Sequence, residues 1–197
     1  LVWGPNWAGL GMRGNSSRQV TLDNVKVPEY HLLGDIGDQV WYVFNIVAPY
    51  FLIAMSGTYI GIAQAALNEA TNNLRERAYS HSGEHLSRSA VLQHRIGMLW
   101  TEVERCRQLI YFAAREGDTE GSKALSAVCA AKADVANTTI HIVNEAMTLC
   151  GGKAYRDGSK LERCLRDARA AHVMAPTTDI LYTWIGRNEL DLPLLGD

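Results

Sequence analysis

Residues 122–152 read SKALSAVCAAKADVANTTIHIVNEAMTLCGG, and this stretch decides the fold. Its many alanines indicate a long helix with small side chains, which allows a second helix to approach closely. The pair Gly151–Gly152 ends the helix, because glycine readily adopts the backbone conformations that follow a helix C-terminus. The stretch therefore predicts a bundle helix over residues 122–149.

Two more long helices are expected before this one. The first runs from about Gln39 to Tyr79, and the second, which carries a clear apolar stripe, runs from about Ser87 to Arg115. Shorter helices are expected over 161–170 and 178–188. Long helices joined by short loops are typical of antiparallel bundles. The fold class is therefore mainly α, an antiparallel four-helix bundle with a short N-terminal β segment.

The first 35 residues differ from the rest. Glycines punctuate them, and alternating apolar and polar residues from Val20 to Val27 predict a strand that Pro28 ends. We therefore divide the chain into a β segment over residues 1–35 and a helical bundle domain over residues 36–197.

Composition excludes several classes of protein. The chain has 197 residues and a net charge of -2, so it offers no basic surface for nucleic acid. Its 47% hydrophobic and 20% charged residues are values of a folded domain. The four cysteines lack CxxC spacing, which favours free thiols in a reducing compartment and a cytoplasmic location.

One segment is apolar enough to raise the question of a membrane. Residues 39–68 carry no charge, but polar residues are scattered around them and Pro49 interrupts the most apolar run. A helix buried on most sides inside the bundle explains this segment better, so no membrane partner is expected.

Two short motifs match the sequences of known binding sites, but the secondary structure expected around them differs from that of those sites. Residues 9–14 match GxGxxG, but a strand should precede and a helix should follow a dinucleotide-binding turn, and here a strand follows. Residues 81–85 read HSGEH, a zinc-protease spelling that needs a helix, whereas Gly83 favours a loop. We expect turns at the first motif, a loop at the second, and no metal site.

Three stretches in order carry a family resemblance. They are residues 10–28, with LGMRGNS and VTLDNVKVP; residues 61–77, which begin GIAQAAL; and residues 150–169, with CGGKAY and LRDAR. Together they resemble the acyl-CoA dehydrogenase family of flavoenzymes. The resemblance implies the end of that family's middle β-domain followed by its C-terminal four-helix domain, which forms dimers or tetramers and covers FAD.

The resemblance also places Leu1 inside the β-domain. We therefore expect a C-terminal fragment, or a split subunit whose flavin-binding half is supplied by a partner chain. Alone, the chain should be inactive.

The resemblance implies several FAD contacts. Arg77 matches an arginine that reaches the flavin pyrophosphate of a neighbouring subunit, and Gln93 matches a glutamine early in the second helix. The other matching positions are Thr148, Gly151, Gly152, Thr177 and Asp179.

The catalytic base is the point of departure from the family. Removing a proton from Cα of an acyl-CoA thioester requires a carboxylate beside the substrate. The usual glutamate is replaced by Ala175, and the position used by a minority of members holds Phe51. Neither side chain can accept a proton. Asp179, one helical turn past Ala175, is the nearest carboxylate in the sequence.

Three functions stay open at this point. The first is FAD-dependent α,β-dehydrogenation of an acyl-CoA thioester in lipid metabolism, with the base in an unusual place. The second is a flavin monooxygenase or oxidase of the same fold, which needs no Cα base. The third is a non-catalytic helical subunit that completes an active partner.

Overall fold

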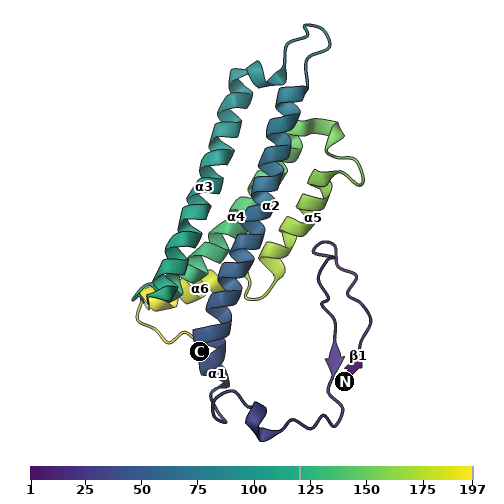
Figure 1. Cartoon of the computed structure of the whole chain (residues 1–197). Coiled ribbons are helices and arrows are strands. Elements are labelled where there is room, and N and C mark those ends of the chain that lie inside the picture. The colour runs from purple at the N-terminus through teal and green to yellow at the C-terminus, as the bar shows by residue number, and fades with distance from the viewer. Residues whose placement is uncertain (120, 197) are drawn as a thin grey trace.

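The computed structural model describes residues 1–119 and 121–196. Four helices alternate in direction and form the predicted antiparallel bundle (Figure 1). They are α2 (Ala48–Glu76), α3 (Ala90–Asp118), α4 (Ala124–Cys150) and α5 (Lys160–Val173), and α6 (Thr178–Glu189) packs against α4. The predicted helices differ from these mainly in where they begin and end.

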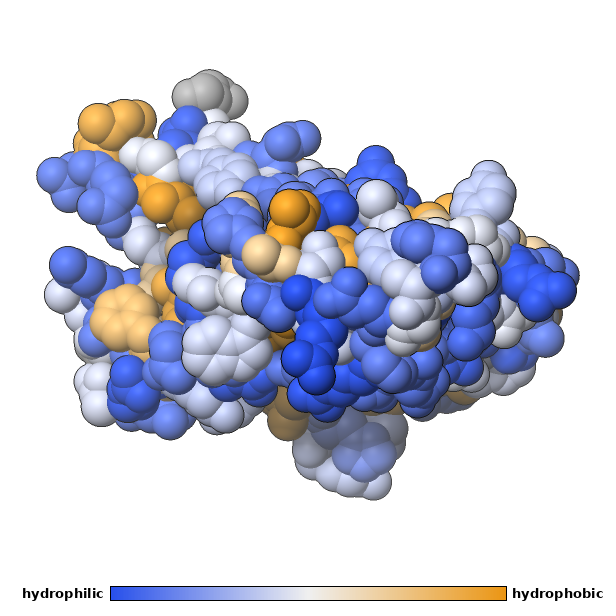
Figure 2. Space-filling model, turned by 90° about the horizontal axis from the view of Figure 1, so that it is seen from above, coloured by the Kyte–Doolittle hydropathy of each residue, from blue (hydrophilic) through white to orange (hydrophobic). Residues whose placement is uncertain are grey.

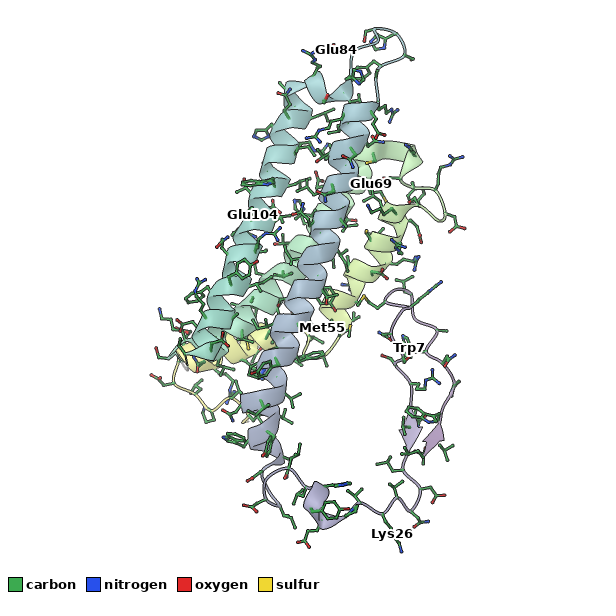
Figure 3. The ribbon with its side chains drawn as sticks, viewed as in Figure 1. Trp7, Lys26, Met55, Glu69, Glu84 and Glu104 are labelled. Carbon is green, nitrogen blue, oxygen red and sulfur yellow. The ribbon has the colours of Figure 1, made fainter. Side chains whose placement is uncertain are left out.

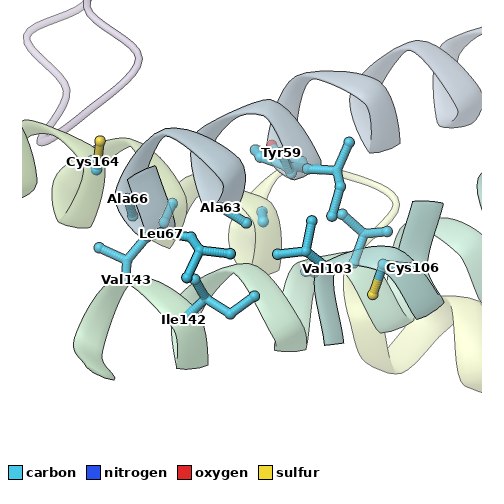
Figure 4. Packing of buried hydrophobic residues seen from close by; sticks show 14 of the residues in the cluster. Tyr59, Ala63, Ala66, Leu67, Val103, Cys106, Ile142, Val143 and Cys164 are labelled. Carbon is cyan, nitrogen blue, oxygen red and sulfur yellow. The ribbon is translucent and has the colours of Figure 1, made fainter. Parts of the chain in front are cut away.

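The Ala-rich helix α4 is the centre of the bundle. It contacts α2, α3, α5 and α6. Alanines of α2, among them Ala63 and Ala66, are fully buried and face Ile142 and Val143 of α4 (Figure 4). Small side chains on α2 and α4 let the two helices pack closely, as the sequence predicts. The core is completed from α3 by Val103 and Cys106.

The first long helix begins in three parts. A short α1 (Gln39–Tyr42) continues through a π-helical turn, η2 (Val43–Val47), directly into α2. Pro49 lies in the first turn of α2, directly after the π-helical turn, so the irregular turn stands where the missing proline N–H interrupts the helical hydrogen-bond pattern.

The prediction that this helix is buried on most sides is wrong for its beginning. Val40, Val47 and Tyr50 are each more than half exposed, and continuous burial begins only around Leu52. The helical stretch Gln39–Glu76 is long and apolar enough to cross a membrane by length and composition, and 28% of its most apolar window is buried. Core helices of globular proteins have the same length and composition, so this helix alone does not indicate a membrane span.

The strand expected from Val20 to Val27 is much shorter. Only β2 (Val20–Thr21) is regular, and it pairs antiparallel with β1 (Val2–Trp3), with Val2 opposite Thr21. A short 3-10 turn, η1 (Glu29–His31), follows. In Figure 3, Trp7 and Lys26 mark how this segment arches away from the bundle. With no further strand beside it among the described residues, the alternating pattern has no sheet to join.

The glycine-rich turn of this segment is fixed to α5. The backbone N–H of Met12 donates to Asp167 Oδ1 (2.6 Å), and Arg166 Nη1 donates to the Leu10 carbonyl (2.9 Å). A Cβ on Gly11 would overlap the backbone of Arg166. The turn therefore needs glycine for close contact with α5, and the GxGxxG spelling has a packing role here.

Candidate functional site

Arg77 follows the last residue of helix α2 and has an exposed side chain. Its backbone N–H donates to Asn73 O (3.0 Å), and its carbonyl accepts from the N–H of Leu86 (2.9 Å). These bonds fix the backbone where the chain leaves the helix. Within the described residues, the guanidinium forms no hydrogen bond and no ion pair, so it is free to bind an anion.

Gly151 lies beside this guanidinium. It caps α4 with φ +64° and ψ -154°, a conformation that practically only glycine adopts. A Cβ on Gly151 would lie 3.8 Å from Arg77 Nη1. Thr148 is exposed on the last turn of α4. The structure thus brings together Arg77, Thr148 and Gly151 at one end of the bundle, which is largely hydrophilic (Figure 2).

A small cavity of about 210 Å³ lies under the same end. Cys150, Lys153 and Lys160 line it, and so does Asn73, one turn before Arg77. Lys160 forms an ion pair with Glu69 of α2 (3.3 Å; Figure 3). Asn73 Oδ1 is buried without a hydrogen-bond partner in the described part of the chain. This end therefore contains an unsatisfied buried acceptor as well as the unpaired Arg77 guanidinium.

Gln93 belongs to a groove between α2 and α3. The groove has a volume of about 770 Å³ and is also lined by Asn68, Arg75 and Trp100. The Gln93 amide donates to the Ser87 carbonyl (2.9 Å), which holds its side chain near the start of α3. Gln93 is thus near the same end as Arg77, on a separate face.

Thr177 and Asp179 lie at the opposite end of the bundle. Thr177 is the N-cap of α6 without a side-chain cap hydrogen bond, and Asp179 is exposed in the first helical turn. The turn before them is bound by Lys132 of α4, which lies about 27 Å along the helix from Cys150 at 1.5 Å per residue. The expected cofactor contacts therefore form two separate groups.

The two family base positions carry no titratable group. Ala175 is exposed in the turn between α5 and α6, and Phe51, in the first turn of α2, is 38% exposed. Nearby, the hydroxyl of Tyr59 donates to Met174 Sδ (3.2 Å). Burial raises the pKa of Tyr59 to about 12, so it is protonated at neutral pH.

His172 is a titratable residue that the sequence did not single out. It lies on the last turn of α5, where burial lowers its pKa and keeps the imidazole neutral at pH 7. Its Nε2 is buried without a hydrogen-bond partner among the described residues. Because Nε2 is enclosed, that nitrogen does not reach a substrate in this arrangement.

Comparison with known proteins gives the family. Residues 52–190 match the family model "Acyl-CoA dehydrogenase, C-terminal domain". The chain belongs to the acyl-CoA dehydrogenase family. The bundle and its order of helices are therefore those of an acyl-CoA dehydrogenase C-terminal domain.

Curated relatives and solved structures agree with this assignment. Cyclohex-1-ene-1-carbonyl-CoA dehydrogenase of Syntrophus aciditrophicus is 27% identical, over 96% of this chain and 45% of its own length. The 3-(aryl)acrylate reductase of Clostridium sporogenes is 28% identical, over 92% of this chain and 47% of its own. Butyryl-CoA dehydrogenase of Megasphaera elsdenii shares the fold with a TM-score of 0.88 at 21% identity, over 96% of this chain and 48% of its own. This chain spans about half the length of the relatives that it matches.

Proposed function

We propose that this chain is the C-terminal part of an FAD-dependent oxidoreductase that removes hydrogen from Cα and Cβ of an acyl-CoA thioester. The observation that carries the proposal is the free Arg77 guanidinium beside the side-chain-free backbone of Gly151. Membership of the acyl-CoA dehydrogenase family supports it.

The residues at this end suit a dinucleotide. A guanidinium binds the oxygens of a diphosphate through two parallel charge-assisted hydrogen bonds, which an ammonium cannot do. Gly151 leaves room for a ligand to approach the backbone, because a side chain there would stand next to Arg77. Bound FAD would supply the hydride acceptor, and this chain would supply the anion site that orients it.

The Cα proton needs an acceptor from another place. Asp179 is the candidate, because its carboxylate is exposed one turn past Ala175. In this proposal Asp179 takes the proton while the hydride leaves Cβ.

A second function is favoured by one specific observation. Ala175 and Phe51 leave both family base positions without a proton acceptor. A flavin monooxygenase or oxidase, which activates oxygen with reduced flavin, needs no Cα base. The third function, a non-catalytic assembly subunit, is favoured by the exposed apolar residues 40–51, which a partner could cover.

Assembly follows from the separation of the two groups of expected contacts. Arg77 and Gly151 would contact the flavin of a neighbouring subunit, whereas Thr177 and Asp179 would contact the flavin of their own subunit. We therefore propose a homodimer or homotetramer in the cytoplasm, with the flavin-binding half supplied by the rest of a longer protein or by a partner subunit.

The test is a flavin spectrum of the full protein under anaerobic conditions. Bleaching by an acyl-CoA supports the dehydrogenase, and loss of bleaching in Asp179→Asn but not in the matched surface variant Asp118→Asn supports the base. Oxygen consumption by reduced flavin with hydroxylation of a small molecule, and no bleaching by any acyl-CoA, would replace the first function by the second. A complex in which this chain touches no flavin would favour the third.

A further inference from the structure

Lys132 is the one charged side chain that is buried among the described residues. It lies on α4 and is only 1% exposed. No carboxylate lies within ion-pair distance of it in the described chain. A buried, unpaired ammonium is costly unless hydrogen bonds compensate it, so its partners are informative.

All three partners of Lys132 are backbone carbonyls of a single turn. Its Nζ donates to Ala171 O (2.8 Å), Pro176 O (2.9 Å) and Met174 O (3.3 Å). An ammonium has three N–H donors, and each of them is used. Two of the acceptors, Met174 and Pro176, stand directly before and after Ala175.

This turn has little else to fix its backbone. Helix α5 ends at Val173, and its last carbonyls have no partner within the helix. A cation at a helix C-terminus also interacts favourably with the helix dipole. The contact of Tyr59 with Met174 Sδ holds one side chain of the turn but no backbone group. Lys132 is therefore the main polar tie between this turn and the bundle.

We propose that Lys132 is a positioning residue, which sets the backbone of residues 174–177 so that Ala175 and Thr177 face flavin and substrate. The inference rests on the proposed flavin chemistry for its consequence and on the three hydrogen bonds for its geometry. Lys132 is not a catalytic residue, because its ammonium is enclosed by protein and reaches no open site.

Replacement by methionine tests this role. Lys132→Met keeps a long unbranched side chain but leaves three carbonyls without a donor. Hydrogen exchange of residues 172–180 should then become at least about tenfold faster, while residues 140–152 keep their protection. Lys123→Met, an exposed lysine before the same helix, is the control and should change neither segment.

Kinetics separates positioning from a purely structural role. In the full protein, Lys132→Met should lower kcat at least about tenfold, because small displacements at a reacting centre are costly. FAD content should fall less than kcat does, since Thr177 is the only expected FAD contact within residues 174–177 and Arg77 and Gly151 lie at the other end of α4. Lys132→Arg keeps donors at this position and should recover part of the kcat.

The inference and the proposed function can fail separately. Wild-type kcat and wild-type exchange in Lys132→Met would overturn the inference, and so would faster exchange spread evenly over the whole bundle. If the unaltered protein has no flavin activity, the proposed function fails, and local exchange at residues 172–180 alone still decides whether Lys132 holds the turn. Should Lys132→Met not fold, Lys132→Arg is measured in its place: a partial loss of kcat with faster exchange confined to residues 172–180 would support the geometry, and faster exchange spread evenly over the bundle would overturn it.

Discussion

Replacing Gly151 by alanine probes the backbone beside Arg77 directly. Gly151 has φ +64° and ψ -154°. A residue with a Cβ costs about 1–3 kcal/mol in this region. The nearest atom to the new Cβ would be Arg77 Nη1 at 3.8 Å, an ordinary contact, so no clash adds to the backbone strain. Gly151→Ala should therefore lower the free energy of unfolding by about 1–3 kcal/mol, or by roughly 2–12 °C in Tm.

The neighbouring glycine provides a matched control. Gly152 has no positive φ, and a Cβ on it would meet open space. Gly152→Ala should be neutral or stabilising by up to about 1 kcal/mol, because alanine restricts the unfolded chain. Urea unfolding followed by far-UV circular dichroism measures both variants. An equal loss of stability in the two would refute the conformation assigned to Gly151.

Three further predictions concern the N-terminal turn, the core and the thiols. Asp167→Ala removes the acceptor of the Met12 N–H, so proteolysis within residues 1–35 should become faster while the bundle keeps its unfolding free energy within about 1 kcal/mol. Ile142→Ala empties a fully buried site and should cost about 2–5 kcal/mol in urea unfolding. Burial raises the pKa of the thiols of Cys106, Cys129 and Cys150 to about 11. The free energy of unfolding should therefore fall between pH 9 and 11, which urea titrations at each pH measure.

The sign of the pH effect follows from proton binding. Between pH 9 and 11 the unfolded thiols have lost protons that the folded thiols retain, so stability falls as pH rises. Lys132 acts in the opposite direction, because burial lowers its pKa to about 8 and the unfolded lysine keeps its proton to higher pH. The free energy of unfolding of Lys132→Met should therefore fall more steeply with pH than that of the unaltered protein. A shallower fall would contradict the directions assigned to the pKa shifts of the thiols and Lys132.

Exposed positions provide control variants for the Asp167→Ala and Ile142→Ala predictions. Asp118→Asn, on the exposed end of α3, should leave proteolysis of residues 1–35 unchanged. Val91→Ala, at a position that is 69% exposed, should change stability by no more than about 0.5 kcal/mol. A similar loss in Val91→Ala and Ile142→Ala would mean that the core is not where the structure puts it.

Local pattern was sufficient to predict the helices and the bundle. The alanines of residues 122–149 and the glycines that follow them carry most of the signal, because small side chains and helix-ending residues act through their immediate neighbours. Local sequence pattern did not predict the structure of segments whose expected neighbouring strand or helix is missing from the described chain or covers them only in part. Val20–Val27 alternates like a strand, yet it pairs only over Val20–Thr21, and α6 covers the apolar start of the first helix only in part, through the contact of Trp184 with Phe44.

The site was predictable only in part. Arg77 and Gly151 came from a family resemblance, and the structure brings them together. The role of Lys132 could not be read from the sequence, since its acceptors are carbonyls some forty residues away and any residue type supplies a carbonyl. The close contact of Gly11 with the backbone of Arg166 could not be predicted either, because the sequence shows the glycine but not which distant segment packs against it.

FAD binding by the full protein tests the central claim most directly. The unaltered protein should bind FAD, and Arg77→Ala should weaken binding by about 10- to 100-fold, as expected for the loss of a charge-assisted bidentate contact. Arg115→Ala, an exposed arginine near the far end of α3, should bind FAD like the unaltered protein. Equal affinity in Arg77→Ala and the unaltered protein, or no FAD binding by either, would contradict the assignment of this end of the bundle to the flavin.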